Sequence, residues 1–158
     1  MNRRGRSRFG GSPEIYYYNS ARRDAVGELA GQLSGLIQEE MTRRHKKKLV
    51  FLCIGTDRST GDSLGPLIGY KLKQARRGGT LGFGTPDRPV HAMNLEHYVQ
   101  VLKNGYPDAL VVAVDASVGD ENHIGYVTLG RGALKPGLGV CKELHAVGDL
   151  FITGIVAG

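Results

Sequence analysis

Residues 49 to 66 read Leu-Val-Phe-Leu-Cys-Ile-Gly-Thr-Asp-Arg-Ser-Thr-Gly-Asp-Ser-Leu-Gly-Pro. The unbroken apolar run from Leu49 to Ile54, closed by Gly55, predicts a strand that is covered on both faces of a sheet. After a polar loop, apolar residues return at helical spacing, and Asp62 or Ser63 can cap that helix. The stretch therefore predicts a strand, a loop and a helix in series, which is where open α/β sheets bind their ligands.

The predicted loop carries carboxylates, an arginine and hydroxyls, which are costly to bury without a partner. Free backbone N–H groups at the following helix N-terminus add outward-pointing donors. A helix cap needs only one of these side chains, so we interpret the loop as a ligand site; the alternative that it only caps the helix and closes a turn stays open. Asp62 is the catalytic candidate. The substrate-binding candidates are Thr56, Asp57, Arg58, Ser59, Thr60 and Ser63.

Asp115 is the second catalytic candidate, because it follows the apolar run Leu110 to Val114 and so should emerge at a strand's carboxyl end. If that strand is a parallel neighbour of the first, Asp115 and Asp62 lie at the same edge of the sheet. Two carboxylates in one cleft do not both ionise easily, so the pair can hold one proton, activate water and protonate a leaving amine. The alternative is an aspartate that caps the turn at residues 117 to 119.

The motif Cys53 to Pro66 resembles that of the YyaC family of spore-forming bacteria, a family of candidate spore proteases. Four later segments resemble the family in the same order, which is more specific than one short motif. They are Thr85-Pro86, Pro89 to Leu95, Val112 to Ala116 and Gly148 to Val156. More distantly, the chain resembles the spore germination protease and the hydrogenase maturation endopeptidases. These resemblances imply a phosphorylase/hydrolase-like fold with an acidic active site. Independently, the alternation of predicted strands and helices favours a three-layer α/β/α sandwich with a largely parallel central sheet.

The resemblance also bears on catalysis and metal binding. The acidic residues of the germination protease lie in contexts that correspond to Asp62 and Asp115. The hydrogenase maturation endopeptidases bind metal with two acidic residues and a later histidine, which implies that His145 holds a divalent metal with Asp62 and Asp115. Zinc, nickel and manganese suit such ligands, but a carboxylate pair requires no cofactor. The alternative is that His145 is a surface or capping residue.

Two other functions compete with a peptidase. The letters Gly61-Asp62-Ser63-Leu64 match the GDSL esterases, with Ser63 as nucleophile, His123 as base and Asp120 orienting it. Against this, six residues separate the motif from the strand, and the Gly-x-Asn-Asp block of those esterases is missing. The second competitor is a non-catalytic sporulation protein that uses the same cleft to bind a peptide or a metal.

Composition and charge are those of a single domain with a basic start. The chain has 158 residues, 41% hydrophobic and 23% charged, and its formal net charge of +6 lies entirely in residues 1 to 48. We interpret those charges as a solvated tail and a basic helix end rather than a nucleic-acid surface. No apolar segment reaches membrane-span length, so we expect a cytoplasmic protein, in the spore or forespore as the resemblance implies, without membrane contact. Cys53 and Cys141 are expected to be core thiols.

The expected partners are a peptide or protein substrate, such as a spore protein, and a second copy of the chain. We expect a mobile tail over residues 1 to 18, with the alternative that Ile15 to Tyr18 pack down at its end, and one α/β domain over residues 19 to 158. Asn19 or Ser20 should cap a long helix. Its apolar stripe is Ala25, Val26, Leu29, Leu33, Leu36, Ile37 and Met41. Further helices are expected from Ser63 to about Arg77 and from Asn94 to Gly105. Strands are expected at Lys48 to Ile54, Leu81 to Phe83 or Val90 to Met93, Ala109 to Val114, and Ile124 to Leu129.

The apolar end from Leu150 to Gly158 would expose a hydrophobic patch if it were left in water. We therefore expect a closing element to be missing after it. On that view these residues pack as a helix beside the cleft or dock on another molecule.

Overall fold

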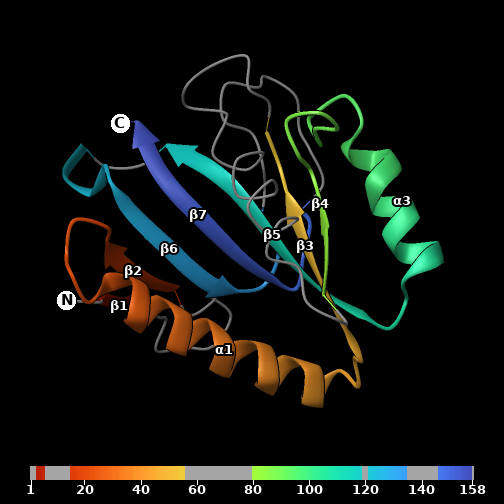
Figure 1. The fold of residues 1–158 in the computed structure, drawn as a ribbon, viewed down its shortest axis with the longest axis horizontal. Coiled ribbons are helices and arrows are strands. Elements are labelled where there is room, and N and C mark those ends of the chain that lie inside the picture. The colour runs from red at the N-terminus through yellow and green to blue at the C-terminus, as the bar shows by residue number, and fades with distance from the viewer. Residues whose placement is uncertain (1–2, 6–14, 56–79, 119–120, 135–145, 158) are drawn as a thin grey trace.

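The computed structural model describes residues 3–5, 15–55, 80–118, 121–134 and 146–157 (Figure 1). Within these ranges, one mixed sheet has the strand order β1-β2-β6-β7-β5-β3-β4. The strands are β1 Arg3–Gly5, β2 Ile15–Asn19, β3 Lys48–Cys53, β4 Thr80–Phe83, β5 Ala109–Val118, β6 Tyr126–Arg131 and β7 Leu150–Ala157. The helices are α1 Ala25–Arg43, α3 Leu95–Gly105 and a 3₁₀ turn, Glu121–His123. The α/β class is confirmed.

The sheet is parallel in one half and antiparallel in the other. Strands β7, β5, β3 and β4 run parallel to one another, while β6, β2 and β1 are added in antiparallel fashion beyond β7. The expected strand pair that carries the catalytic candidates exists, because β3 and β5 are parallel neighbours. Their carboxyl ends therefore lie at the same edge of the sheet, which meets the condition stated in the sequence analysis.

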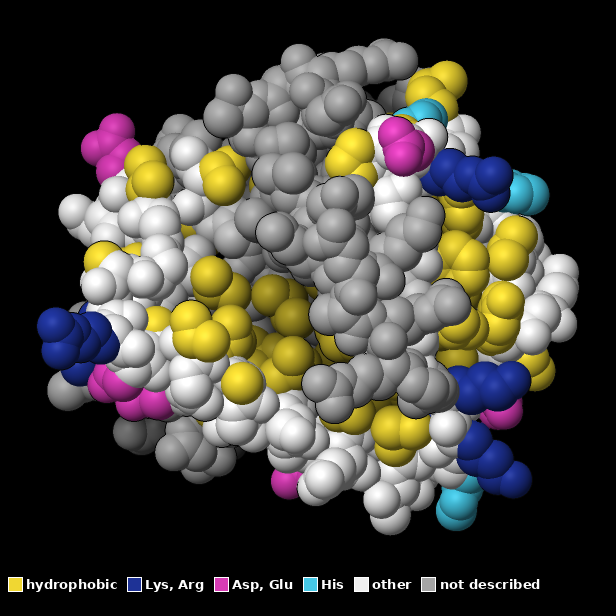
Figure 2. All heavy atoms as spheres, in the orientation of Figure 1, with side chains coloured by type: hydrophobic (Ala, Val, Ile, Leu, Met, Phe, Trp, Pro, Cys, Tyr) yellow, Lys and Arg dark blue, Asp and Glu magenta, His cyan; other side chains and the backbone are white. Residues whose placement is uncertain are grey.

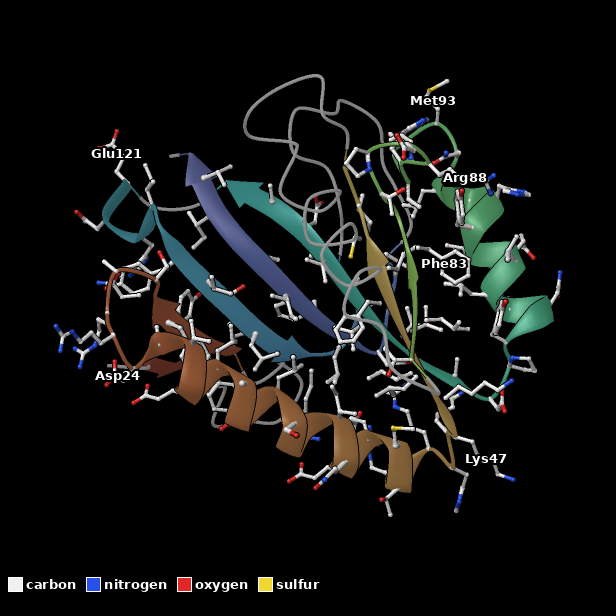
Figure 3. All side chains as sticks on the ribbon, in the orientation of Figure 1. Asp24, Lys47, Phe83, Arg88, Met93 and Glu121 are labelled. Atoms are coloured by element: carbon white, nitrogen blue, oxygen red, sulfur yellow. The ribbon has the colours of Figure 1, made fainter. Side chains whose placement is uncertain are left out.

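The two α-helices pack on opposite faces of the sheet, which is why β3 is apolar from Leu49 to Cys53. Val50 and Leu52 pack in one cluster with Leu95 and Leu102 of α3, and Phe83 of β4 adds edge-to-face ring contacts with Tyr98 and Tyr106 (Figure 3). The intervening residues of β3 pack against the second cluster, beneath α1. Figure 2 shows hydrophobic side chains gathered in a hollow beside α1. The partly buried members of this second cluster are Leu29, Leu33, Ile37, Met41, Leu49, Phe51 and Ile152.

Helix α1 begins later than the sequence predicted. Its N-cap is Asp24, whereas Asn19 ends β2 and its side-chain oxygen accepts a hydrogen bond from the Ala21 backbone N–H. The expected cap at Asn19 or Ser20 is therefore wrong, because Asn19 closes a turn instead. The expected apolar stripe packs on the sheet with one exception, Val26, which is 77% exposed.

The N-terminal segment enters the sheet before residue 19. Strand β2 pairs with β6 over its whole length, and Tyr16 and Tyr18 are buried in the cluster beneath α1. The expected boundary between a tail ending at residue 18 and a domain starting at residue 19 is therefore wrong. The arginine-rich composition suggested a solvated tail, but the three consecutive tyrosines supply enough apolar surface to hold a strand.

The C-terminal segment is a strand, so the expected helix is wrong. Strand β7 lies between β5 and β6, with Leu150 and Ile152 packed on the α1 side. A short apolar run does not distinguish a buried strand from a buried helix by periodicity alone. The β-branched residues Ile152, Thr153, Ile155 and Val156 favour the strand. None of the helices in the described ranges is long and apolar enough to cross a membrane.

Candidate functional site

Asp115 lies where β3 ends, although it belongs to β5 rather than following it. Val114 pairs with Cys53, the last residue of β3, and the Val114 carbonyl accepts a hydrogen bond from the Ile54 N–H over 2.8 Å. Asp115 is therefore one residue beyond the partner of the last β3 residue, next to the point where the chain leaves that strand. Residues 117 and 118 continue β5, so the alternative that Asp115 caps a turn there is wrong.

The Asp115 carboxylate is inside the protein. The residue is 4% exposed, and its Oδ1 accepts a hydrogen bond of 2.8 Å from the Ala116 backbone N–H. Ala109 and Ala113 of the same strand belong to the core cluster that packs against α3. Because side chains alternate along a strand, Asp115 projects to this same α3 side. A buried carboxylate is costly unless it is hydrogen-bonded or paired, which makes Asp115 a candidate functional residue.

Asp115 begins a row of polar residues that crosses the sheet. Asp115 pairs with Thr153 of β7, Thr153 with Thr128 of β6, and Thr128 with Tyr17 of β2. Directly paired residues project to the same face, so all four lie on the side away from α1. The two threonines are buried, and their hydroxyls hydrogen-bond to each other. Sequence analysis missed both threonines, because only the strand register reveals that they share a row with Asp115.

The end of β3 is held by two close backbone contacts. The Gly55 N–H donates to the Val90 carbonyl over 2.7 Å. Gly84 adopts a φ of +94°, and a Cβ there would lie 1.9 Å from the Cys53 carbonyl oxygen, so only glycine fits. Cys53 is a buried core thiol, as the sequence predicted, and burial raises its pKa to about 12, which keeps the thiol protonated and unreactive.

The segment around Val90 is fixed by Asn94, the N-cap residue of α3. Its Oδ1 accepts a hydrogen bond of 2.7 Å from the His91 backbone N–H, and its Nδ2 donates to the Pro89 carbonyl over 2.9 Å. The position of Asn94 at the helix start and the helix end at Gly105 are confirmed. However, the Asn94 side chain points back to the preceding loop instead of capping the helix. It therefore supports the loop whose Val90 holds the end of β3.

His123, the base of the esterase alternative, packs among aromatic rings. Its ring centroid lies 5.5 Å from that of Tyr17 and 5.1 Å from that of Tyr126. It follows β5 on the 3₁₀ turn Glu121–His123, while Asp120 and Ser63 lie outside the described residues. The structure therefore gives His123 a packing role and does not test its distance to Ser63.

Most of the candidate site residues lie outside the described ranges. These are Thr56, Asp57, Arg58, Ser59, Thr60, Asp62, Ser63 and His145. Of the three expected metal ligands, the structure describes Asp115 alone. In the described part of the chain, no three His, Cys, Asp or Glu residues are close enough to hold a metal ion. The expected helix from Ser63 to Arg77, and Cys141, also lie outside these ranges.

Two comparisons place the chain among known sequences. A family model described as "Protein of unknown function (DUF1256)" matches residues 17–158. A protein of Bacillus subtilis (strain 168), described as "Uncharacterized protein YyaC", is 42% identical over 156 residues. That match covers 99% of this chain and 74% of the relative. The similarity thus extends over every element that carries or supports Asp115.

Proposed function

This chain belongs to the DUF1256 family, and we propose that it is a peptidase that uses Asp115 and Asp62 to hydrolyse peptide bonds. The observation that carries the proposal is the buried Asp115 carboxylate beside the carboxyl end of a parallel neighbouring strand. Asp62 lies seven residues after Gly55, the residue that follows this strand region in the sequence. We further propose that the whole fold is the three-layer, phosphorylase/hydrolase-like sandwich, which is consistent with helices on opposite faces of the sheet.

The proposed chemistry needs one proton shared by two carboxylates. The ionised member takes a proton from water, and the resulting hydroxide attacks the peptide carbonyl carbon. The protonated member hydrogen-bonds the developing oxyanion, and a proton then passes to the leaving amine as the C–N bond breaks. Asp115 suits a fixed role in this scheme because the backbone N–H of Ala116 holds one of its oxygens. The hydroxyls and N–H groups of residues 56 to 63 would bind the peptide carbonyls.

A divalent metal held by Asp62, Asp115 and His145 is a variant of the same proposal. Two carboxylates and an imidazole suit such an ion, which would polarise the substrate carbonyl when bound. If hydrolysis survives treatment with EDTA, the carboxylates alone activate the water. If hydrolysis is lost both on treatment with EDTA and in His145→Ala, the metal activates the water. The sporulation role and spore location rest on the resemblance in the loop and strand motifs.

The proposal is tested by digesting an unbiased peptide library and identifying the products by mass spectrometry. We expect Asp62→Asn and Asp115→Asn each to reduce turnover at least about a hundredfold, because each removes half of one acid/base unit, and the double variant to be no worse than either. Asp108→Asn is the matched control, because it makes the same change at the opposite end of β5. It should cleave like the wild type.

Three outcomes would overturn the proposal. Absence of cleavage by the wild type would favour the non-catalytic sporulation protein that only binds in the cleft. Cleavage that survives both aspartate substitutions but is lost in Ser63→Ala would favour the esterase chemistry. Equal loss of activity in the Asp108→Asn control would attribute the effects to general destabilisation.

A further inference from the structure

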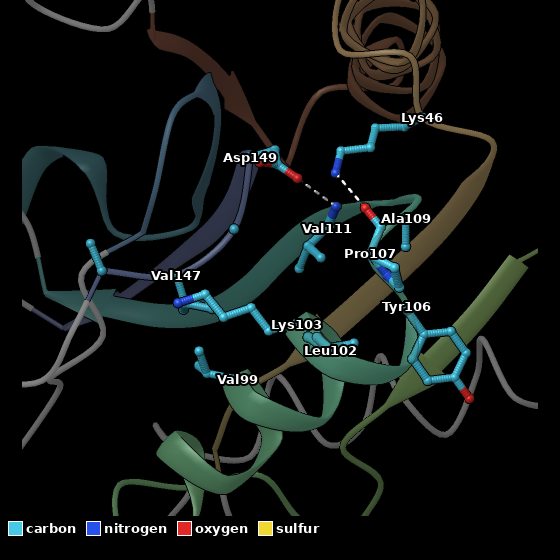
Figure 4. A pocket seen from close by; sticks show the side chains of 12 residues that line it. Lys46, Val99, Leu102, Lys103, Tyr106, Pro107, Ala109, Val111, Val147 and Asp149 are labelled. Carbon is cyan, nitrogen blue, oxygen red and sulfur yellow. Dashed lines mark hydrogen bonds between the residues drawn. The ribbon is translucent and has the colours of Figure 1, made fainter.

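A cavity lies at the end of the sheet opposite to Asp115. It measures about 380 Å³ and is bounded by α3, the start of β5 and the segment leading into β7 (Figure 4). Val99 and Leu102 of α3 form one wall, and Val111 and Val147 lie across from them. Its volume is at the small end of the range of ligand pockets, which suits a compact molecule.

The charged groups of this cavity are not balanced. Lys46 and Lys103 both line it, from the segment before β3 and from α3 respectively (Figure 4). The Lys46 Nζ donates to the Pro107 carbonyl over 2.8 Å, which leaves two of its three donor positions for other partners. In the part of the chain that the structure describes, no carboxylate lies within ion-pair distance of either lysine.

The carboxylate at the rim, Asp149, is already engaged. Its Oδ1 accepts from the Arg44 guanidinium over 2.7 Å, and its Oδ2 accepts from the Val111 N–H over 2.9 Å. The Asp149 N–H in turn donates to the Val111 carbonyl over 2.7 Å, which fixes the rim. Asp149 thus does not compensate the lysines. The cavity therefore presents an apolar interior with net positive charge at its edge.

We propose that this cavity between α3 and the start of β5 binds a small aliphatic monocarboxylate. The hydrocarbon group packs against Leu102 and Val147, and the carboxylate binds the ammonium groups of Lys103 and Lys46. A cation is repelled by the lysines, whereas a neutral molecule of the same shape gains the apolar contacts but not the charge-assisted hydrogen bonds. The site is separate from Asp115 and does not depend on peptidase activity.

The test is a titration of the full chain with hexanoate, followed by ¹H–¹⁵N NMR. We expect saturable shifts at the N–H groups of Val111, Gly148 and Lys103, with a Kd of about 1 mM, which is typical of a ligand of so few atoms. The double variant Lys46→Gln with Lys103→Gln should weaken binding about tenfold. The double variant Lys47→Gln with Lys48→Gln removes the same charge from exposed neighbours outside the cavity and should bind like the wild type.

Hexanamide and hexylamine serve as matched probes of the same length, neutral and cationic. Each should bind at least about tenfold more weakly than hexanoate, because neither carries the negative charge that forms an ion pair with the lysine ammonium groups. The proposal is overturned if hexanoate gives no saturable shift by about 10 mM, since the expected Kd is well below that concentration. It is equally overturned if either matched probe binds as tightly as hexanoate, or if the control double variant weakens binding as much as the lysine pair.

Discussion

Glu40 is completely buried near the end of α1, and three arginines surround its carboxylate. Arg43 donates over 2.7 Å, Arg44 over 3.1 Å and Arg131 of β6 over 3.2 Å. Hydrogen bonds and charge attraction, first from Arg43 and then from Arg44, lower the pKa of Glu40 to about 2, although burial acts in the opposite direction. Part of the basic run that the sequence suggested to be a solvated helix end is therefore bound to a buried carboxylate, in a charge cluster that joins α1 to the sheet.

Acid should destabilise the protein through Glu40. Its pKa is about 2 in the folded state and about 4.5 when unperturbed, so the stabilisation is complete above about pH 4.5 and is lost as the pH falls towards 2. The pKa difference corresponds to an upper limit of about 3 kcal/mol. Urea unfolding as a function of pH measures it. Glu40→Gln should remove this pH dependence and lower the stability at neutral pH.

Glu39→Gln is the control for that experiment. Glu39 is the neighbouring residue and also pairs with Arg131, but its side chain is 62% exposed. Neutralising it should change the free energy of unfolding by less than about 1 kcal/mol, because exposed ion pairs contribute little. The role assigned to the buried carboxylate would be contradicted if the two substitutions changed the free energy of unfolding equally. It would also be contradicted if Glu40→Gln lost stability at low pH in the same way as the wild type.

The strands differ in how well the sequence predicted them. Strand β3 was predictable because it is an unbroken apolar run of strand length that is bounded by Gly55, and both of its faces are covered. Strand β7 has the same kind of run but was expected to be a helix, since nothing local in the sequence shows that it inserts between β5 and β6. Strand β2 was hidden by its arginine-rich surroundings, and only its pairing with β6 explains its burial.

Two truncations should separate the contributions of the N-terminal strands. Removal of residues 1 to 14 takes away β1, which pairs only with β2, and should lower Tm by a few degrees at most. Removal of residues 1 to 19 also takes away Tyr16 and Tyr18, and should cost at least about 3 kcal/mol because it opens the core beneath α1. Thermal unfolding followed by circular dichroism measures both. Equal stability of the two truncated chains would show that β2 does not contribute to the core.

At the level of the complete molecule, the sequence predicted the sheet edge that carries Asp115 better than it predicted the other residues at that edge. Apolar runs ending near Gly55 and Asp115 were sufficient to predict two strands, and the structure shows that these strands are parallel neighbours with a shared carboxyl edge. The polar row through Thr153 and Thr128 was not predictable, because it depends on which strands are neighbours and in what register. The cavity beside Lys103 was missed for the same reason, since its walls come from segments far apart in the chain.

The central claim is that Asp115 and Asp62 act as one proton-sharing pair, and a titration tests it without knowledge of the substrate. The side-chain carboxyl ¹³C signal of Asp115 is followed by NMR against pH in the wild type and in Asp62→Asn. We predict that Asp115 loses its proton at a lower pH in Asp62→Asn, because the substitution removes the negative neighbour that favours the protonated form. An Asp115 titration that is identical in the two proteins would contradict the claim.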